Sequence, residues 1–441
     1  MIPDNVKKYL KKYSLPGWKI EHAGLDNINN ALVIPAIQEF ENIKILLSSF
    51  AENDKTYFPL TLLIFVVNNS INTPASIKEE NKKTIDYLKL LIKKNNDKQD
   101  SISKKVISSG LRLSLVNASS PGNELPAKEA GVGMARKIGM DLALTIFNYN
   151  SSAKKILLCL DADCTVEKNY LTEVIENFNK KNLTAAVINF KHTIPDEKEK
   201  DEAITAYEIF LRYYVLGLKY AGSPYAFHTI GSTMACDVNS YVKVEGMNKR
   251  KAAEDFYFLE KLAKITMIER INSTTVYPAG RASWRVPFGT GQRVSRFLSK
   301  THDEYLLYNP QSFYILKEWL DIFINDNNIL DAELYLEKAR LINKILFEFL
   351  QLQKFKNSWT NILKNCSDRE HLKRQKKDWF DGFRTMKLIH FFRDNGFPMI
   401  NMFDAMDEFL YKIKLSSPIR NEKIPNLKIQ KEYLEILRNI T

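Results

Sequence analysis

The sequence predicts an α/β fold in which a mainly parallel sheet is flanked by helices and followed by a helical C-terminal region. Three observations support this prediction. Apolar strand patterns alternate with amphipathic helix patterns over the first two-thirds of the chain. The run Leu60 to Val67 is almost entirely apolar, as a strand buried on both faces of a parallel sheet requires. From about residue 305 onward, long helical patterns replace the alternation.

The elements follow one another in a regular order. Apolar residues recur at helical spacing between the strand patterns, and this rhythm predicts a doubly wound sheet. Ligands of such sheets bind beyond the carboxyl ends of the strands. The expected strands are residues 31–34, 60–67, 111–116, 155–160 and 185–190, and the clearest expected helices are 43–50, 135–146 and 171–178.

The composition limits the class of protein. Of the 441 residues 45% are apolar, which is enough for a large core, and we expect one domain over 1–304 and a helical region over 305–441. The net charge of +12 fits anionic partners such as nucleic acid, lipid or phosphate-bearing ligands, but a solvated lysine-rich surface is the preferred interpretation. Four cysteines without a CxxC pair argue against zinc and favour a reducing compartment. No signal peptide or membrane-spanning segment is evident, so we expect a cytoplasmic protein.

The N-terminal segment alternates lysines with apolar residues. Lys7, Lys8, Lys11 and Lys12 flank Val6, Tyr9, Leu10 and Tyr13. This pattern is typical of a helix that lies on a membrane surface, which would place the protein peripherally at the inner membrane face. A short solvated helix is the preferred alternative.

Two acids end the apolar strand 155–160. Asp161 and Asp163 repel each other and resist burial, so a strand end that carries both indicates a need for negative charge. Oxygen ligands suit Mg²⁺ or Mn²⁺, which usually bridges to substrate phosphates. The structural alternative is a turn or a helix cap.

A second pair of acids, Glu254 and Asp255, precedes an amphipathic helix pattern. The helix dipole favours acids in this position, which is the structural explanation. The functional explanation is that one of them acts as a general base and takes the proton of a hydroxyl group.

Two glycine-containing stretches are candidates for contact with a ligand. Gly131 and Gly133 precede the helix 135–146, and the neighbouring Lys128, Arg136 and Lys137 could meet phosphate charge, although the spacing matches neither GxGxxG nor a Walker A loop. Gly231 and Ser232 lie in a run of small residues that lets a ligand approach the backbone, or that packs tightly within a strand.

Arginines and an aromatic residue mark a further loop. Arg281, Trp284 and Arg285 suit a charged, ring-shaped ligand, because arginine pairs with phosphate and aromatic faces stack on sugars and bases. His228 and His302 are candidates for a third metal ligand, but hydrogen-bonded structural histidines are the preferred interpretation.

In this order the motifs resemble those of the family 2 glycosyltransferases, which have the GT-A fold. The matching stretches cover roughly residues 30–290. They are Val33-Ile34-Pro35-Ala36 with Glu39, Asp161-Ala162-Asp163, Gly231-Ser232-Thr233-Met234-Ala235 and Ala253-Glu254-Asp255.

The resemblance implies metal-dependent transfer of a sugar from a nucleotide-diphosphate donor to an acceptor hydroxyl, with inversion. It implies a nucleotide-sugar half at about 30–165 and an acceptor half at 166–304. Asp163 would hold the metal, and Asp161 would contact the ribose or the metal. Asp255 would be the base, and Glu254 an acceptor or structural contact. Pro35, Ala36 and Glu39 would line the nucleotide pocket.

Two departures from the family pattern bear on these expectations. Asn68-Asn69-Ser70 stands where the family often has an acidic pair, so the choice of nucleotide stays open, although an asparagine still accepts a hydrogen bond. Gln292 to Phe297 only approximates the QxxRW motif of the membrane-embedded, polymerising members, which favours a non-processive enzyme.

The alternatives are a retaining glycosyltransferase of the same fold, a sugar-1-phosphate nucleotidyltransferase and a non-enzymatic basic binding protein. A sugar-1-phosphate nucleotidyltransferase should carry a Gly- and Lys/Arg-rich loop after its first strand, and the stretch 36–40 lacks one. No interleaved basic and aromatic stripe supports nucleic-acid binding by the third.

Overall fold

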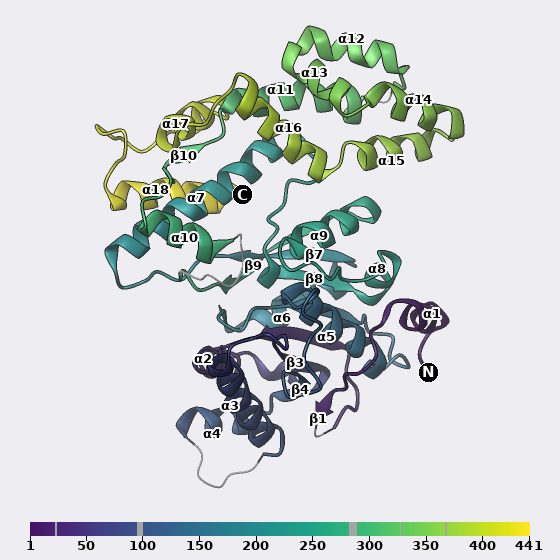
Figure 1. The fold of residues 1–441 in the computed structure, drawn as a ribbon, viewed down its shortest axis with the longest axis vertical. Coiled ribbons are helices and arrows are strands. Elements are labelled where there is room, and N and C mark those ends of the chain that lie inside the picture. Colours follow the sequence, from purple (N-terminus) through teal and green to yellow (C-terminus); the bar gives the residue numbers. More distant parts are fainter. Residues whose placement is uncertain (23, 95–99, 282–288, 327, 367) are drawn as a thin grey trace. The chain divides into compact units, whose positions relative to one another are not determined.

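A computed structural model describes residues 1–441 apart from 23, 95–99, 282–288, 327 and 367 (Figure 1). The contacts among its elements divide the chain into two compact units. The first contains Met1–Thr193 and Thr229–Ala279, and the second contains Ile194–His228 and Gly289–Thr441. The segments 194–228 and 289–304, which we expect from the sequence in the first domain, thus belong to the second unit.

The first unit is built on a nine-stranded sheet, which confirms the predicted mainly parallel α/β fold. The strand order is β1-β4-β3-β2-β5-β8-β7-β9-β6. Strands β4, β3, β2 and β5 are parallel, β8 is antiparallel to its neighbours β5 and β7, and β7 pairs in parallel with β9. The strands are β1 Glu21–His22, β2 Asn30–Ala36, β3 Thr61–Asn68, β4 Arg112–Ala118, β5 Ile156–Cys159, β6 Thr165–Val166, β7 Ala185–Phe190, β8 Met234–Asp237 and β9 Glu269–Tyr277.

The winding of the sheet reverses between β2 and β5. From β2 the chain moves outward to β3 and β4, and then returns to place β5 on the other side of β2. The register pairs Val33 with Cys159, and the amide of Leu160 donates to the carbonyl of Val33 at 3.1 Å. In wound sheets a ligand crevice forms at such a reversal, outside the carboxyl ends of the strands.

Helices cover both faces of the parallel part of the sheet. Leu32 and Ile34 of β2 share a core with apolar residues of α2, α3 and α6, whereas Val33 points to the opposite face, where it contacts α5 beside Gly139. The helices and 3₁₀ turns of this unit are α1 Asp4–Tyr13, α2 Phe40–Phe50, η1 Lys55–Leu60, α3 Ala75–Ile92, α4 Ser101–Ser109, α5 Val132–Ile146, α6 Tyr170–Lys180, η2 Gly231–Thr233, α8 Val238–Lys243 and α9 Glu254–Ile265.

Helix α1 is not a solvated helix, because one of its faces is buried. Tyr9 is 3% exposed, and its hydroxyl donates to Asp141 of α5 at 2.7 Å. Lys137 contacts the same carboxylate at 2.8 Å, and Tyr241 donates to it at 2.7 Å. Gly246 leaves the space that the Tyr9 ring needs, since a Cβ there would overlap the Tyr9 hydroxyl. The apolar side of α1 is therefore used within the unit.

The second unit is almost entirely helical, and an aromatic core fills it. Trp319, Phe323, Phe355, Trp359 and Trp379 pack edge to face or stacked within this core. Its elements are α7 Lys198–Tyr220, α10 Thr290–Leu298, β10 Leu306–Leu307, α11 Pro310–Leu320, the π-turn η3 Asp321–Asn325, α12 Ala332–Ile342, α13 Lys344–Leu352, α14 Phe355–Asn365, α15 Arg369–Trp379, α16 Gly382–Asn395, β11 Ile400–Asn401, α17 Met402–Lys412 and α18 Leu427–Ile440.

Ion pairs join the last helix, α18, to α7. Glu208 of α7 is 1% exposed, and both of its oxygens accept hydrogen bonds from Arg438 of α18, at 2.8 and 3.0 Å. Arg212 contacts the same carboxylate at 2.9 Å. Lys431 pairs with Asp201 at 2.6 Å closer to solvent. Among the described residues, no helix of either unit has the length and apolar character needed to cross a membrane.

Candidate active site

Polar side chains gather where the parallel strands end. Glu39 follows β2, Asn68 ends β3, Ser119 follows β4, and Asp161 follows β5. Because these strands are parallel neighbours, their carboxyl ends lie along one edge of the sheet. Pro35 and Ala36, the last residues of β2, are buried in the middle of this edge.

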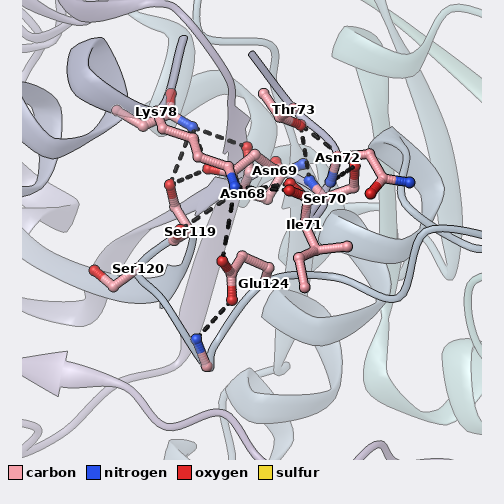
Figure 2. A network of polar contacts seen from close by, with 12 residues as sticks. Asn68, Asn69, Ser70, Ile71, Asn72, Thr73, Lys78, Ser119, Ser120 and Glu124 are labelled. Atoms are coloured by element: carbon pink, nitrogen blue, oxygen red, sulfur yellow. Dashed lines mark hydrogen bonds and ion pairs between the residues drawn. The ribbon is translucent and has the colours of Figure 1, made fainter. Parts of the chain in front are cut away.

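A hydrogen-bonded network fixes the loops after β3 and β4 (Figure 2). Asn69 Oδ1 accepts from the Ser119 hydroxyl and, at 3.0 Å, from Asn81 of α3. Its Nδ2 donates to the carbonyl of Ser119 at 3.3 Å. Asn68 enters the network through its carbonyl, which accepts from Asn81 at 3.1 Å. The backbone that carries the Asn68 side chain is therefore held rigidly.

A charged pair closes the outer side of this network. Lys78 Nζ donates to the Ile71 carbonyl at 2.7 Å and lies 3.9 Å from Glu124, whose other oxygen accepts from the Gly122 amide at 2.6 Å (Figure 2). These contacts tie the loop after β3 to the loop after β4. Together with the contacts of Asn69 to Ser119, they make the two loops one surface beside the strand ends.

The acid pair Asp161 and Asp163 lies directly after β5, at the reversal of the winding. Both side chains are half-buried, and Ala162 between them is buried. Asp161 Oδ1 lies 2.5 Å from Nη2 of Arg136, while the Asp161 side chain keeps 37% of its surface exposed. The pair thus faces partly toward solvent at the site where a wound sheet places its ligand.

Arg136 joins the two acidic motifs. Its guanidinium contacts Asp161 through Nη2 and Glu254 of α9 through Nη1, and only 2% of its side chain is exposed. Burial by itself lowers the pKa of this arginine, but the charges of Asp161 and Glu254 raise it above its ordinary value. Arg136 belongs to the first turns of α5, which begin at the carboxyl edge of the sheet because α5 runs back between two parallel strands.

Gly231 makes room for this guanidinium. A Cβ at residue 231 would lie 2.3 Å from Nη2 and 2.6 Å from Nη1 of Arg136. The turn η2 comes just before β8, and β8 pairs with β5, so Gly231 lies next to the end of β5. The neighbouring Ser232 is 1% exposed. The structure thus explains the glycine by close packing against Arg136.

The second acidic motif begins helix α9 at a strained backbone position. Ala253, just before the helix, has a left-handed φ of 58°, which is uncommon for a residue with a side chain and is often found at functional sites. Burial raises the pKa of Glu254. Burial and the neighbouring charge of Glu254 raise the pKa of Asp255 to about 7, while the charge of Arg136 opposes this rise. A carboxylate with such a pKa suits general-base chemistry near neutral pH.

The two glycines at the start of α5 have a packing role. A Cβ on Gly133 would lie 2.4 Å from the carbonyl oxygen of Arg250 and 2.9 Å from Cβ of Glu254, and one on Gly131 would lie 2.8 Å from Cα of Lys251. From the sequence we expect these glycines and Arg136 to meet phosphate. The structure instead uses them to bring α5 against the loop before α9.

The two lysines of the same stretch, Lys128 and Lys137, differ in burial. Lys137 is buried against Asp141 and Tyr9, so it does not face a ligand, whereas Lys128 lies exposed on the loop before α5. Lys128 therefore keeps its expected freedom to meet a charged ligand.

The remaining candidates are divided between the two units. Arg281, His228 and His302 belong to the second unit; His228 is buried, and His302 is exposed beside Thr301. Trp284 and Arg285 lie outside the described residues. Glu39 is buried at the start of α2, where it accepts a hydrogen bond from Asn42.

The acid pair fits a hard divalent cation in chemical type. Within the described parts of the chain, no three His, Cys, Asp or Glu side chains are grouped so that they could hold a metal by themselves. Mg²⁺ and Mn²⁺ need only one or two protein carboxylates when a diphosphate and water supply the other oxygens. The contact of Asp161 Oδ1 with Arg136 leaves Oδ2 for such a cation, with Asp163 two residues on.

No protein-family model and no curated protein sequence matches the chain. Among solved structures, S. aureus TarS 1–349 in complex with UDP-GlcNAc has 13% sequence identity and a TM-score of 0.38, over 94% of this chain and 90% of that one. The mannosyltransferase PcManGT from Pyrobaculum calidifontis, in complex with GDP-Man and Mn²⁺, has 11% identity and a TM-score of 0.37, over 88% and 92%. All these values are too low to carry an argument about function, which therefore rests on the residues themselves.

Proposed function

We propose that the protein is a glycosyltransferase that moves a sugar from a nucleotide-diphosphate sugar to an acceptor hydroxyl. The observation that carries this proposal is the connection of Asp161 to Glu254 through Arg136. It brings a candidate cation site and a candidate general base to the carboxyl edge of a wound sheet, at the reversal of its winding. The motifs that resemble family 2 glycosyltransferases meet at this edge.

The donor would lie along the strand ends. Pro35, Ala36, Glu39 and Asn68 would line the pocket for the nucleoside, because they end β2 and β3 or follow them. An amide such as that of Asn68 both donates and accepts, which suits the edge of a nucleobase. The exposed Lys128, on the loop before α5, is a further candidate for donor contact.

Asp163 and the free oxygen of Asp161 would hold Mn²⁺ or Mg²⁺. When bound, such a cation neutralises the charge that develops on a departing diphosphate. The negative charges of Asp161 and Asp163 would attract the cation to the end of β5. Gly231, at the same place, makes room for the Arg136 guanidinium that contacts Asp161.

Asp255 would accept the proton of the acceptor hydroxyl. The freed oxygen would attack the anomeric carbon from the face opposite the diphosphate, so that a new glycosidic bond forms while the bond to the diphosphate oxygen breaks. The nucleoside diphosphate leaves with the electron pair of that bond, and the configuration inverts. Glu254, which Arg136 holds in place, is assigned the role of positioning α9 and the carboxylate next to it.

Donor binding tests this proposal directly. We expect one nucleotide-diphosphate sugar from a panel to raise the melting temperature of the protein, and to raise it more with Mn²⁺ than without, because ligand binding stabilises the folded state by mass action. Asp163→Asn should remove the part of the shift that depends on Mn²⁺. Asp86→Asn, at an exposed position on α3, is the matched control and should keep it.

Two results would contradict the proposal. The first is a panel in which no nucleotide sugar changes the melting temperature of the unaltered chain. The second is an Asp163→Asn variant whose donor binding responds to Mn²⁺ and to a chelator as in the unaltered protein. Product analysis of the active donor would then separate inversion from retention at the anomeric carbon.

A further inference from the structure

The end of α17 and its connection to α18 expose an unusual number of apolar side chains. Tyr411 is 85% exposed, Leu415 40%, Ile419 89% and Ile424 43%. The other large exposed apolar residues among those described are scattered along the chain, so this segment of 14 residues stands out. In Figure 1 the connection projects from the helices of the second unit.

This connection is held in a defined conformation. Arg420 donates to Asp407 of α17 at 2.8 and 2.9 Å, contacts Asp404 at 2.5 Å, and donates to the carbonyl of Glu422 at 3.0 Å. The hydroxyl of Tyr433 lies 3.4 Å from the carbonyl of Pro418. The anchored segment thus keeps Ile419 in water, next to the residue that anchors it, although burying that side chain would be favourable.

The charge left on the segment is positive. Asp404 and Asp407 already neutralise Arg420. Lys412, Lys414, Lys423 and Lys428 are exposed, and none of them makes an ion pair with another described residue. The acid within this stretch is Glu422. Exposed apolar side chains interspersed with exposed lysines along residues 411–428 match a surface that is apolar inside and anionic outside.

We propose that residues 411–428 dock the protein onto an anionic lipid surface. Tyr411, Leu415, Ile419 and Ile424 would enter the boundary between headgroups and acyl chains, while the lysines stay with the headgroups, since their long side chains reach the interface. The argument uses the second unit alone and is independent of the proposed glycosyltransferase activity. It moves membrane contact from the N-terminal helix, whose apolar face is buried, to this connection.

Vesicle sedimentation of the full chain tests the proposal. We expect binding to vesicles of equimolar phosphatidylcholine and phosphatidylglycerol, weak binding to phosphatidylcholine alone, and loss of binding as salt screens the lysines. The pair Tyr411→Ser and Ile419→Ser should lower the partition coefficient about tenfold, because each removes apolar area from the membrane. Lys412→Gln with Lys414→Gln should lower it on the anionic vesicles only.

Matched controls come from the same unit. Leu341 and Leu352 are 82% and 66% exposed at the ends of α12 and α13, so Leu341→Ser with Leu352→Ser removes similar apolar surface elsewhere. Lys338→Gln with Lys364→Gln removes two exposed charges from α12 and α14. Both control variants should bind the anionic vesicles as the unaltered protein does.

A fluorescent reporter shows whether this segment enters the lipid. The four native cysteines are buried, so Ile419→Cys offers an exposed thiol for an environment-sensitive dye. Its emission should shift to the blue on the anionic vesicles, and that of a dye at Leu341→Cys should not. Three outcomes would overturn the proposal: no vesicle binding by the unaltered chain, equal losses in the controls, or a dye response that follows self-association without lipid.

Discussion

Asp255 experiences opposing electrostatic influences. Burial and Glu254 raise its pKa to about 7, while Arg136 opposes the rise. A base must be ionised to accept a proton, so the active fraction grows as pH rises through this pKa. We expect kcat/KM to fall about tenfold for each pH unit below 7 and to level off above it.

The variant Asp255→Asn checks this assignment. It should lower kcat by about a hundredfold or more while leaving donor affinity unchanged, because the amide cannot take a proton. Steady-state rates over a pH series and donor titrations give both quantities. Turnover close to that of the unaltered protein, or an acid limb that persists in the variant, would exclude Asp255 as the base.

Arg136 is the residue at which the two acidic motifs depend on each other. Arg136→Met removes the positive charge that lowers the pKa of Asp255, so the acid limb of the rate profile should move to higher pH. Arg136→Lys keeps a positive charge and should leave the acid limb near its original pH. Turnover can still slow, because lysine cannot contact Asp161 and Glu254 at once as the guanidinium does. An acid limb that is the same in all three proteins would mean that Arg136 has no electrostatic effect on the base.

The sequence predicts the acidic residues of this site but not their connection. Asp161 and Asp163 are conspicuous because carboxylates at the end of a buried strand are costly. Arg136 joins Asp161, 25 residues away, to Glu254, 118 residues away. Sequence spacing cannot reveal a contact between residues so far apart in the chain. The sequence pattern of a helix start with lysine or arginine is also the same whether these residues face a phosphate or a carboxylate. Gly231 makes room for the Arg136 guanidinium, so its role cannot be predicted without knowledge of the contacts that Arg136 makes.

At the scale of elements, long apolar strands are predicted well and short ones are not. Strands β2 and β3 bury every residue, β4 buries five of its seven, and all three are recognised by their apolar runs. Strand β8 has four residues and is antiparallel in a largely parallel region, so the pattern Met234–Asp237 does not distinguish it from a loop. Helix α7 follows a polar stretch and carries charged residues on its buried face. Apolar residues therefore recur less regularly at helical spacing, and the helix is harder to predict.

The packing of α5 on the sheet depends on Gly139. A Cβ there would lie 2.5 Å from Val33 of β2 and 2.9 Å from Val66 of β3. Gly139→Ala should therefore lower the free energy of unfolding by about 1–3 kcal/mol, since overpacking outweighs the gain in helix propensity. Val33→Ala in the same chain should restore part of the loss by removing the methyl groups in the way.

Urea unfolding followed by circular dichroism measures this effect, with Val33→Ala alone as the control. The single valine variant should be less stable than the unaltered protein, because it leaves a cavity. If the two substitutions together cost as much as the sum of each alone, the helix does not approach the sheet as closely as described.

At the scale of the whole molecule, charge pairs between α7 and α18 differ in burial. Arg438→Met removes two hydrogen bonds from the buried Glu208 and should destabilise the second unit by about 2 kcal/mol. Lys431→Met, which breaks the more exposed pair with Asp201, should cost about 1 kcal/mol or less. Equal costs would contradict the assigned difference in burial.

Tryptophan fluorescence reports mainly on this unit, with Trp18 of the first unit as a further emitter. Trp319, Trp359 and Trp379 lie in its aromatic core. Their emission during unfolding by urea therefore follows the second unit, while circular dichroism follows both. For Arg438→Met we expect the tryptophan transition to move to lower urea concentration, and the circular dichroism signal to shift only in the part that the second unit contributes.

The same pairing has a consequence for biosynthesis. Helix α7 leaves the ribosome between strands β7 and β8, but its partner residues Lys431 and Arg438 are each translated 230 residues after the acids they contact. Until then the carboxylate of Glu208 and the apolar face of α7 have no helix α18 to cover them. The synthesis of α18 thus sets the earliest moment at which the helical unit can close.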